Sequence, residues 1–186
     1  MLKKLTVVLA SFLMLAACSN DQAATPEKET EAPKKEEAAV EQKEMAEKGF
    51  ITRVTESEIL VNNVYFTVDE NVTVQSDNGS EKSDAVISDI RAGMKVSVDY
   101  KGPLGGSFPM EGEADAVTIL TDEESTEQAD ALQAFIKGEK LSSILMMGQP
   151  IVRDNEFGFL FNNMETGKVS EVKVDLDTHK YTIDAK

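Results

Sequence analysis

Residues 49–68 read GFITRVTESEILVNNVYFTV, and this stretch decides the fold that we expect. Apolar and polar residues alternate along it in short runs, which is the pattern of β-strands with one buried face. It predicts strands over residues 50–54, 58–61 and 64–68. Residues 55–57 form one separator, and Asn62 with Asn63 suits a two-residue hairpin turn because asparagine tolerates positive φ. Short strands with close turns predict a small barrel or sandwich.

The same alternation continues downstream and predicts three further strands, over residues 72–74, 95–100 and 113–120. Between them, residues 75–83 read QSDNGSEKS and predict a polar loop. Residues 88–93 predict one helical turn, with Ser88 as its N-cap and Gly93 at its end.

Two segments of this region carry a family resemblance. Residues 90–100 read IRAGMKVSVDY and residues 102–109 read GPLGGSFP. Their order and wording resemble the YobA-like lipoprotein domain of Gram-positive bacteria, and the resemblance covers residues 49 to about 120. It implies an OB-like β-barrel and an envelope location. No reaction is established for that family, so the resemblance implies no activity.

The second half of the chain predicts a helix followed by an antiparallel sheet. Ser125 and Gln128 form a capping-box pattern that opens the helix, Leu132 and Phe135 lie on its apolar stripe, and Gly138 ends it. Phe157, Phe159 and Phe161 alternate onto one face of a strand that should pack against that stripe. The expected strands cover residues 144–147, 151–153, 156–161, 169–175 and 181–184.

The expected fold class is therefore α+β and β-rich, with a small OB-like antiparallel barrel followed by a helix-plus-antiparallel-sheet unit. We place the barrel at residues 49–121 and the second unit at residues 122–186. A single continuous α+β domain, in which the helix packs on the barrel, is the alternative. One helix followed by antiparallel hairpins is also faintly similar to PepSY-type envelope modules, which are linked to peptidase regulation.

The N-terminus predicts export and lipidation. Lys3 and Lys4 precede an apolar run over residues 5–17, which is too short to span a bilayer and suits a cleavable signal. The run ends in LAAC at residues 15–18, which resembles the bacterial lipobox. The resemblance implies cleavage between Ala17 and Cys18 and a diacylglycerol on Cys18, the only cysteine. Residues 1–17 would be the signal peptide, and residues 18–48, poor in large apolar residues, a solvated tether.

Charge limits the partners. The formal net charge is -15, and removing Lys3 and Lys4 with the signal gives -15 - 2 = -17. Such a balance opposes phosphate binding and excludes nucleic acid as the expected partner. We expect the lipid to hold the chain at the extracytoplasmic face of the cell membrane, where the folded part meets a protein partner or a small ligand.

The candidate binding loop is rich in glycine and proline and contains Gly102, Pro103, Phe108 and Pro109. The alternative for this loop is a rigid connection in which Phe108 plugs one end of the barrel. A second candidate surface is the uninterrupted apolar stretch ILMM at residues 144–147, which forms either an internal seam or a face open to a partner.

We expect no catalytic residues, no metal site and no cofactor beyond the acyl group on Cys18. His179 is the only histidine, and it lies in a turn-like acidic segment. No nucleophile motif or phosphate loop is present. The sequence therefore favours a non-catalytic binding or accessory module. The alternative is a carboxylate- or divalent-ion-dependent envelope enzyme, with its acids drawn from Asp99, Glu111, Glu113 and Asp115.

Overall fold

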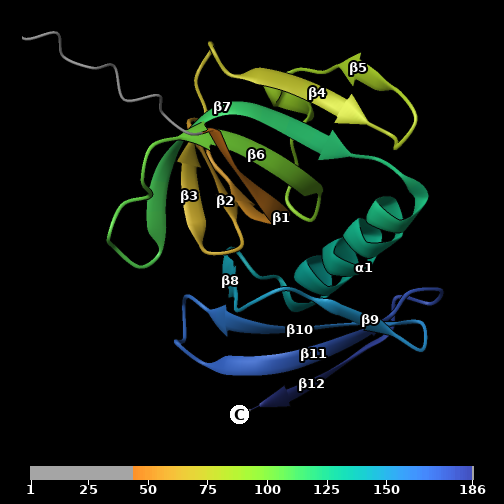
Figure 1. Ribbon diagram of the computed structural model, residues 1–186. Helices are drawn as coiled ribbons and strands as arrows, with labels where there is room; N and C mark the ends of the chain where they lie inside the picture. Colours follow the sequence, from red (N-terminus) through yellow and green to blue (C-terminus); the bar gives the residue numbers. More distant parts are fainter. Residues whose placement is uncertain (1–43, 186) are drawn as a thin grey trace, which may run out of the picture. The chain divides into compact units, whose positions relative to one another are not determined.

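Two β-sheets and one α-helix make up the part of the chain that the structure describes (Figure 1). A computed structural model describes residues 44–185, which belong to one compact unit. The prediction of a β-rich chain with a single α-helix is confirmed for these residues. The lipobox, Ala17 and Cys18 lie outside the described residues.

Five strands of the first sheet form a closed hydrogen-bonded ring. β1 (Glu44–Val54) pairs with β2 (Glu58–Val61) and with β6 (Lys95–Lys101), while β3 (Val64–Thr67) pairs with β2. β7 (Met110–Leu120) pairs with β6 and, in parallel, with β3, which closes the ring. The expectation of a purely antiparallel arrangement is therefore wrong at the β3–β7 contact. β7 is long enough for β3 to pair with residues 110–113 and for β4 to pair with residues 116–120.

Strand β1 begins at Glu44, ahead of the boundary that the sequence predicts at Gly49. Residues 44–50 pair along β6, from Glu44 opposite Lys101 to Phe50 opposite Lys95. This pairing uses backbone groups, which every residue carries whatever its side chain, so polar residues can extend a strand wherever a partner strand continues.

Residues 75–83 do not form the predicted polar loop. They contribute to a hairpin made by β4 (Thr73–Asp77) and β5 (Lys82–Asp84), and β4 also pairs in parallel with β7. The chain turns at Asn78–Gly79, where Gly79 has φ +85° and Asp77 accepts a hydrogen bond from its N–H. The predicted helical turn is a short 3₁₀ turn, Ile87–Asp89, and Ser88 lies inside it rather than at its cap.

The interior of the ring is aliphatic. Its buried side chains come from every strand of the ring and are mostly valine and isoleucine, with Phe66 and Tyr100 in contact at 5.4 Å between ring centroids. β-branched side chains suit this position because they pack well on a pleated surface. The members buried on the five ring strands are Ile51, Ile59, Val61, Val64, Phe66, Val96, Val98, Tyr100, Val117 and Ile119.

The second sheet is open and antiparallel. Its order is β12 (Tyr181–Ala185), β11 (Val169–Asp175), β10 (Glu156–Asn163) and β8 (Ile144–Met146), and β9 (Ile151–Arg153) also pairs with β10. Asp154 and Asn155, both at positive φ, form the predicted tight turn between β9 and β10. Helix α1 (Glu123–Glu139) contacts both β6 and β11.

The predicted capping box does not begin the helix. α1 begins at Glu123, and Asp122 is its N-cap, accepting a hydrogen bond from the Ser125 N–H at 3.0 Å. Ser125 is instead buried within the first turn. The helix runs one residue past Gly138 to Glu139, and Lys140 is its C-cap in a left-handed conformation.

The core of the second sheet is aromatic. Phe157, Phe159 and Phe161 point toward α1, as predicted, and Phe135 of the helix contacts Phe159 and Phe161 at 5.5 and 5.3 Å between centroids. Phe50 of β1 belongs to the same core and meets Phe157 edge-on at 5.3 Å. The ring and the second sheet therefore share a packed contact.

Candidate functional site

The candidate site lies on the outer face of the second sheet. Successive side chains of a strand point to opposite faces, so the inward phenylalanines of β10 leave Glu156, Gly158 and Leu160 outward. Gly158 has no side chain, and a groove of about 480 Å³ lies over this region. The residues that line it come from β9, β10, β11, the β8–β9 connection and the β9–β10 turn: Met147, Gln149, Ile151, Arg153, Asp154, Glu156, Gly158, Phe159, Leu160, Glu171 and Lys173.

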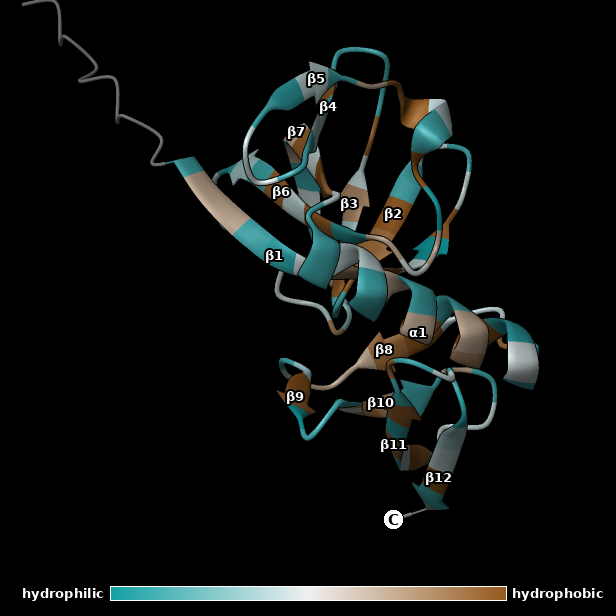
Figure 2. Ribbon diagram, turned by 90° about the vertical axis from the view of Figure 1, so that its right-hand side faces the viewer, coloured by the Kyte–Doolittle hydropathy of each residue, from teal (hydrophilic) through white to brown (hydrophobic). Residues whose placement is uncertain are grey.

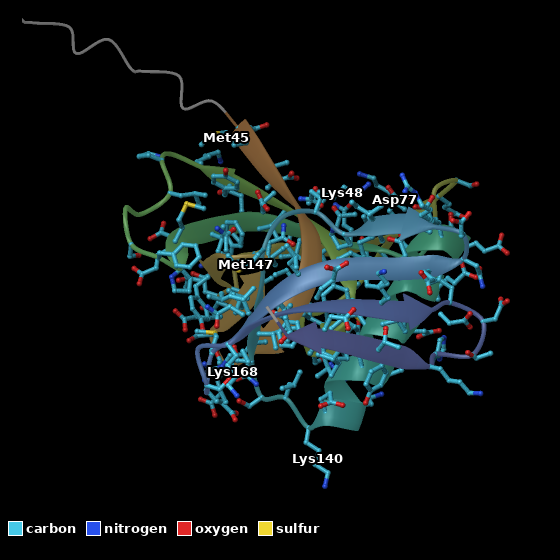
Figure 3. The ribbon with its side chains drawn as sticks, turned by 90° about the horizontal axis from the view of Figure 1, so that it is seen from below. Met45, Lys48, Asp77, Lys140, Met147 and Lys168 are labelled. Carbon is cyan, nitrogen blue, oxygen red and sulfur yellow. The ribbon has the colours of Figure 1, made fainter. Side chains whose placement is uncertain are left out.

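Apolar side chains along this groove are exposed. Ile151 is 66% exposed and Met147 is 44% exposed. Both lie along the β8–β9 edge, which Figure 2 colours as hydrophobic. Figure 3 views the molecule from below, from the side of the second sheet, and labels Met147. Exposed apolar side chains that gather beside a groove make this face the candidate binding surface.

Charged side chains flank the hollow in a defined order. Gly158 lies opposite Ile151 on one neighbouring strand and Lys173 on the other. One row along, Glu156 lies opposite Arg153 and Asp175. The groove thus combines an apolar centre with charges of both signs, an arrangement that gives orientation to a bound segment.

The backbone does not require glycine at position 158. A Cβ built there meets only the carbonyl oxygens of Ile151 and Val172, at 3.6 and 3.8 Å, which are ordinary contacts. No positive φ is present to favour glycine. The consequence of Gly158 is therefore the open floor of the groove rather than a turn or a close packing contact.

Of the predicted apolar stretch at residues 144–147, the first three side chains are buried and the fourth is open. Ile144 and Met146 belong to the aromatic core, and the Met146 N–H donates to the carbonyl of Asn62 in the ring at 3.2 Å. Met147 faces the groove. Residues 144–146, which form β8, are therefore an internal seam, and only Met147 is exposed.

The predicted binding loop lies elsewhere and does not line the groove. Phe108 is 66% exposed, so the expectation that it plugs the ring is wrong. Leu104 packs against the ring core instead. The Gly105 N–H donates to the Glu111 carbonyl at 2.7 Å and the Ser107 hydroxyl to the Pro109 carbonyl at 2.8 Å. These bonds hold the loop with Phe108 in solvent, alongside Gly102 at φ +84° and Pro103.

The acidic residues considered for catalysis form an exposed stripe. Glu111, Glu113 and Asp115 alternate along β7, Asp99 is exposed on β6, and Lys101 pairs with Asp115 at 3.4 Å. Within residues 44–185, no group of three His, Cys, Asp or Glu side chains is placed to hold a metal ion. Over the same residues, no helix has both the length and the hydropathy to cross a membrane.

His179 lies in the β11–β12 turn at φ +54°, and its N–H donates to the Asp175 carbonyl at 2.8 Å. Asp175 also accepts hydrogen bonds from the Thr178 hydroxyl and N–H, at 2.6 and 2.7 Å. These bonds favour the ionised carboxylate and lower the pKa of Asp175. The segment is a hydrogen-bonded turn.

These features define a β-rich chain with a closed ring, an open second sheet and a solvent-facing groove on that sheet. Residues 48–121 match a family described as "Protein of unknown function (DUF3221)". The chain therefore contains a DUF3221 domain, which covers the ring and stops just before Asp122, the N-cap of α1. Neither the search of curated proteins nor the search of solved structures found a match.

Sequence reasoning did not identify the groove. One signal was available, because a glycine inside a strand often marks a close approach or an unfilled position. Gly158 interrupts the outward side chains of a strand that carries Phe157, Phe159 and Phe161 on its inward face. The exposure of Ile151 could not be predicted from the sequence, because apolar residues such as those at 151 and 152 also occur in strands that are covered on both faces.

Proposed function

We propose that this chain is a lipid-anchored envelope protein whose folded part is a non-catalytic binding module. The LAAC motif at residues 15–18, behind Lys3, Lys4 and an apolar run, supports attachment of diacylglycerol to Cys18. Two acyl chains would hold the chain stably at the extracytoplasmic face, since each buried CH₂ contributes about 0.8 kcal/mol.

The ring is, in this proposal, an OB-like barrel of the YobA-like kind. Its five strands, closed by the parallel β3–β7 pair, and the DUF3221 match both support this assignment. Nucleic acid is not its ligand, because single-strand binding needs a basic groove with stacking aromatics. The outward residues of β7 are Glu111, Glu113 and Asp115 instead.

The groove over Gly158 is the proposed binding surface, and it receives an apolar side chain of a protein partner. The observation that carries this is the exposure of Ile151 and Met147 beside a hollow of about 480 Å³. Apolar side chains gain free energy when water leaves both surfaces, about 25 cal/mol per Å² buried. Arg153, Glu156 and Lys173 would set the orientation of the partner.

A photoreactive phenylalanine analogue at position 151 tests the groove in living cells. We expect a cross-linked adduct of one defined mass that disappears when Gly158→Leu fills the floor. The same analogue at position 108 is the matched control, because Phe108 is equally exposed but outside the groove. An adduct at position 151 that survives Gly158→Leu would exclude the groove as the contact.

Metabolic labelling with a fatty acid tests the anchor separately. We expect label on the wild-type chain and none on Cys18→Ala, which should also leave the membrane fraction. Label that persists in Cys18→Ala would refute the lipobox without affecting the groove.

A further inference from the structure

A second, smaller pocket of about 180 Å³ lies where the ring meets α1 and the β8–β9 connection. Phe50 of β1 and Phe157 of β10 form its aromatic part. Its remaining lining residues combine opposite charges, two amides and two apolar side chains: Lys95, Glu124, Gln128, Gln149, Pro150 and Val152. The volume suits a ligand of few atoms.

Lys95 is the unusual member of this pocket. Its side chain is partly buried, yet within residues 44–185 no carboxylate lies at ion-pairing distance from its ammonium. The ammonium lies 5.7 Å from the centroid of the Phe50 ring and donates to the Gln128 Oε1 at 2.9 Å. An ammonium has three donors, so two remain for a ligand. After the hydrogen bonds from Ser125, the charge of Lys95 also helps to lower the pKa of Asp122, and the two remaining donors of the Lys95 ammonium favour a further anionic group beside it.

Gln128 separates Lys95 from the acid of the pocket. Its Nε2 donates to Glu124 Oε1 at 2.8 Å, while its Oε1 accepts from Lys95. Gln128 is only 5% exposed, so its amide is held in this position. The pocket therefore presents a cation and an anion that are kept apart by one amide, with the donor site and the acceptor site in a fixed order.

We propose that this pocket binds a free α-amino acid. Its carboxylate would accept from Lys95, as the Gln128 Oε1 does, and its ammonium would donate to Glu124, as the Gln128 Nε2 does. The two charged groups of an α-amino acid are attached to one carbon, so a single ligand can present a carboxylate to Lys95 and an ammonium to Glu124. Val152, Pro150 and Phe157 would contact an apolar side chain.

This binding is specific because both charges are needed. A ligand that lacks the ammonium places its carboxylate near Glu124 without compensation, and one that lacks the carboxylate leaves the two remaining donors of Lys95 without an anion. Hydrogen bonds between charged groups are stronger than neutral ones, and at the partly buried Lys95 leaving one unmade costs more than its formation contributes, whereas Glu124 is exposed. The proposal does not depend on the groove over Gly158.

Isothermal titration of the full-length chain with L-leucine, N-acetyl-L-leucine and L-leucinamide tests the proposal. We expect L-leucine to bind with a Kd below about 1 mM and the other two, which each lack one charge, to bind at least about tenfold more weakly. No heat with L-leucine, or equal affinity for all three, would overturn the proposal.

Variants assign the two charges. Lys95→Met and Glu124→Gln should each weaken L-leucine binding by at least about tenfold. Glu124→Gln should at the same time strengthen binding of N-acetyl-L-leucine, because the repulsion of its carboxylate is removed. Lys101→Met, outside the pocket, should leave all affinities unchanged. Unchanged L-leucine binding in Lys95→Met would refute the assignment.

A variant that changes no charge separates loss of binding from loss of the fold. Val152 is 46% exposed at the pocket wall, so Val152→Phe should narrow the pocket without disturbing the core. We expect it to keep the melting temperature of the wild type and lose L-leucine binding. Retained binding in a folded Val152→Phe would place the ligand elsewhere and contradict the proposal.

Discussion

The ring and the second sheet bury their inner faces in different ways. The ring closes on itself, so valine and isoleucine from its own strands cover one another. The second sheet is open, and its inner face is covered by α1 and by Phe50 of the ring, through a cluster of phenylalanine side chains. Large aromatic side chains span the wider gap between a sheet and a helix, whereas β-branched side chains fill the narrow interior of a small ring.

The candidate binding surface lies on the second sheet because that sheet is open and the ring is closed. A closed ring has one interior, and its outward face is polar along β7. An open sheet has a second face that no element of residues 44–185 covers at Gly158, and there Ile151 and Met147 remain exposed. Closure stabilises a sheet without a covering element, whereas an open sheet leaves a face and an edge that can take part in binding.

Truncating the aromatic core should produce the largest loss of stability. Phe135 is fully buried and contacts Phe159, Phe161 and Tyr181. Phe135→Ala removes these contacts and leaves a cavity, so we expect the free energy of unfolding to fall by about 3–5 kcal/mol in urea titrations followed by circular dichroism. Phe108→Ala, at an exposed position, should change it by less than about 0.5 kcal/mol. Equal losses in the two variants would contradict the aromatic core.

The contact of β1 with Asn62, whose carbonyl accepts from the Met146 N–H of the second sheet, should give the next largest effect. Asn62 is buried at φ +55°, accepts from the Phe50 N–H at 3.4 Å and donates to Glu47 Oε1 at 2.6 Å. A Cβ on Gly49 would overlap the Asn62 side chain. Gly49→Ala should therefore lower the free energy of unfolding by about 1–3 kcal/mol.

A double-mutant cycle isolates this contact. Asn62→Gly keeps the positive φ but removes the side chain, so Gly49→Ala should cost less in that background than in the wild type. Chemical denaturation of the four proteins measures the difference. Additive costs would show that the two residues do not meet.

The helix that covers the open sheet should depend on its cap. Asp122→Ala removes the acceptor for the Ser125 N–H, and we expect a loss of about 0.5–2 kcal/mol. Glu127→Ala, at an exposed helix position, is the control. A loss in the control as large as that in Asp122→Ala would refute the capping role.

The cap should also depend on pH. Hydrogen bonds from the Ser125 hydroxyl and N–H lower the pKa of Asp122 below the usual value of about 3.9. Because the folded-state pKa is lower than the unfolded-state pKa, this contribution is complete above the unfolded pKa and disappears as the pH falls through the folded pKa. We therefore expect the difference in stability between wild type and Asp122→Asn to shrink below about pH 4. A difference that is constant from pH 7 to about pH 2 would contradict it.

The smallest change in stability is expected at a glycine of the open sheet, and a glycine of the ring provides the contrast. Gly158→Ala should change the free energy of unfolding by less than about 0.5 kcal/mol, because its Cβ meets only ordinary contacts. A Cβ on Gly112 of β7 would lie 2.8 Å from Leu104 and 3.1 Å from Phe66. Gly112→Ala should cost about 1–3 kcal/mol. Thermal melts of the two variants decide whether the groove floor at Gly158 has room for a side chain.

Sequence patterns were sufficient where the structure is local. Strands β2, β9 and β11 have the predicted bounds, because alternation and turn residues such as Asn62, Asp154 and Asn155 act within a few residues of the chain. The helix was predicted from its apolar stripe, although its cap was placed at Ser125 instead of Asp122. Both residues are good caps, and only the direction in which the chain leaves β7 selects between them.

For residues 44–185, the amino-acid sequence by itself determined the β-rich class, the single helix and the aromatic face of β10, since these follow from the period of the side chains. Tertiary structure alone decided the start of β1 at Glu44, the β4–β5 hairpin, the parallel closure of the ring and the groove over Gly158. Backbone hydrogen bonds form with whichever strand lies alongside, and a glycine becomes a groove floor only when neighbouring strands place side chains around it. Neither the strand pairing nor the groove can be predicted from the residues that form it, because each depends on segments that are distant in the chain.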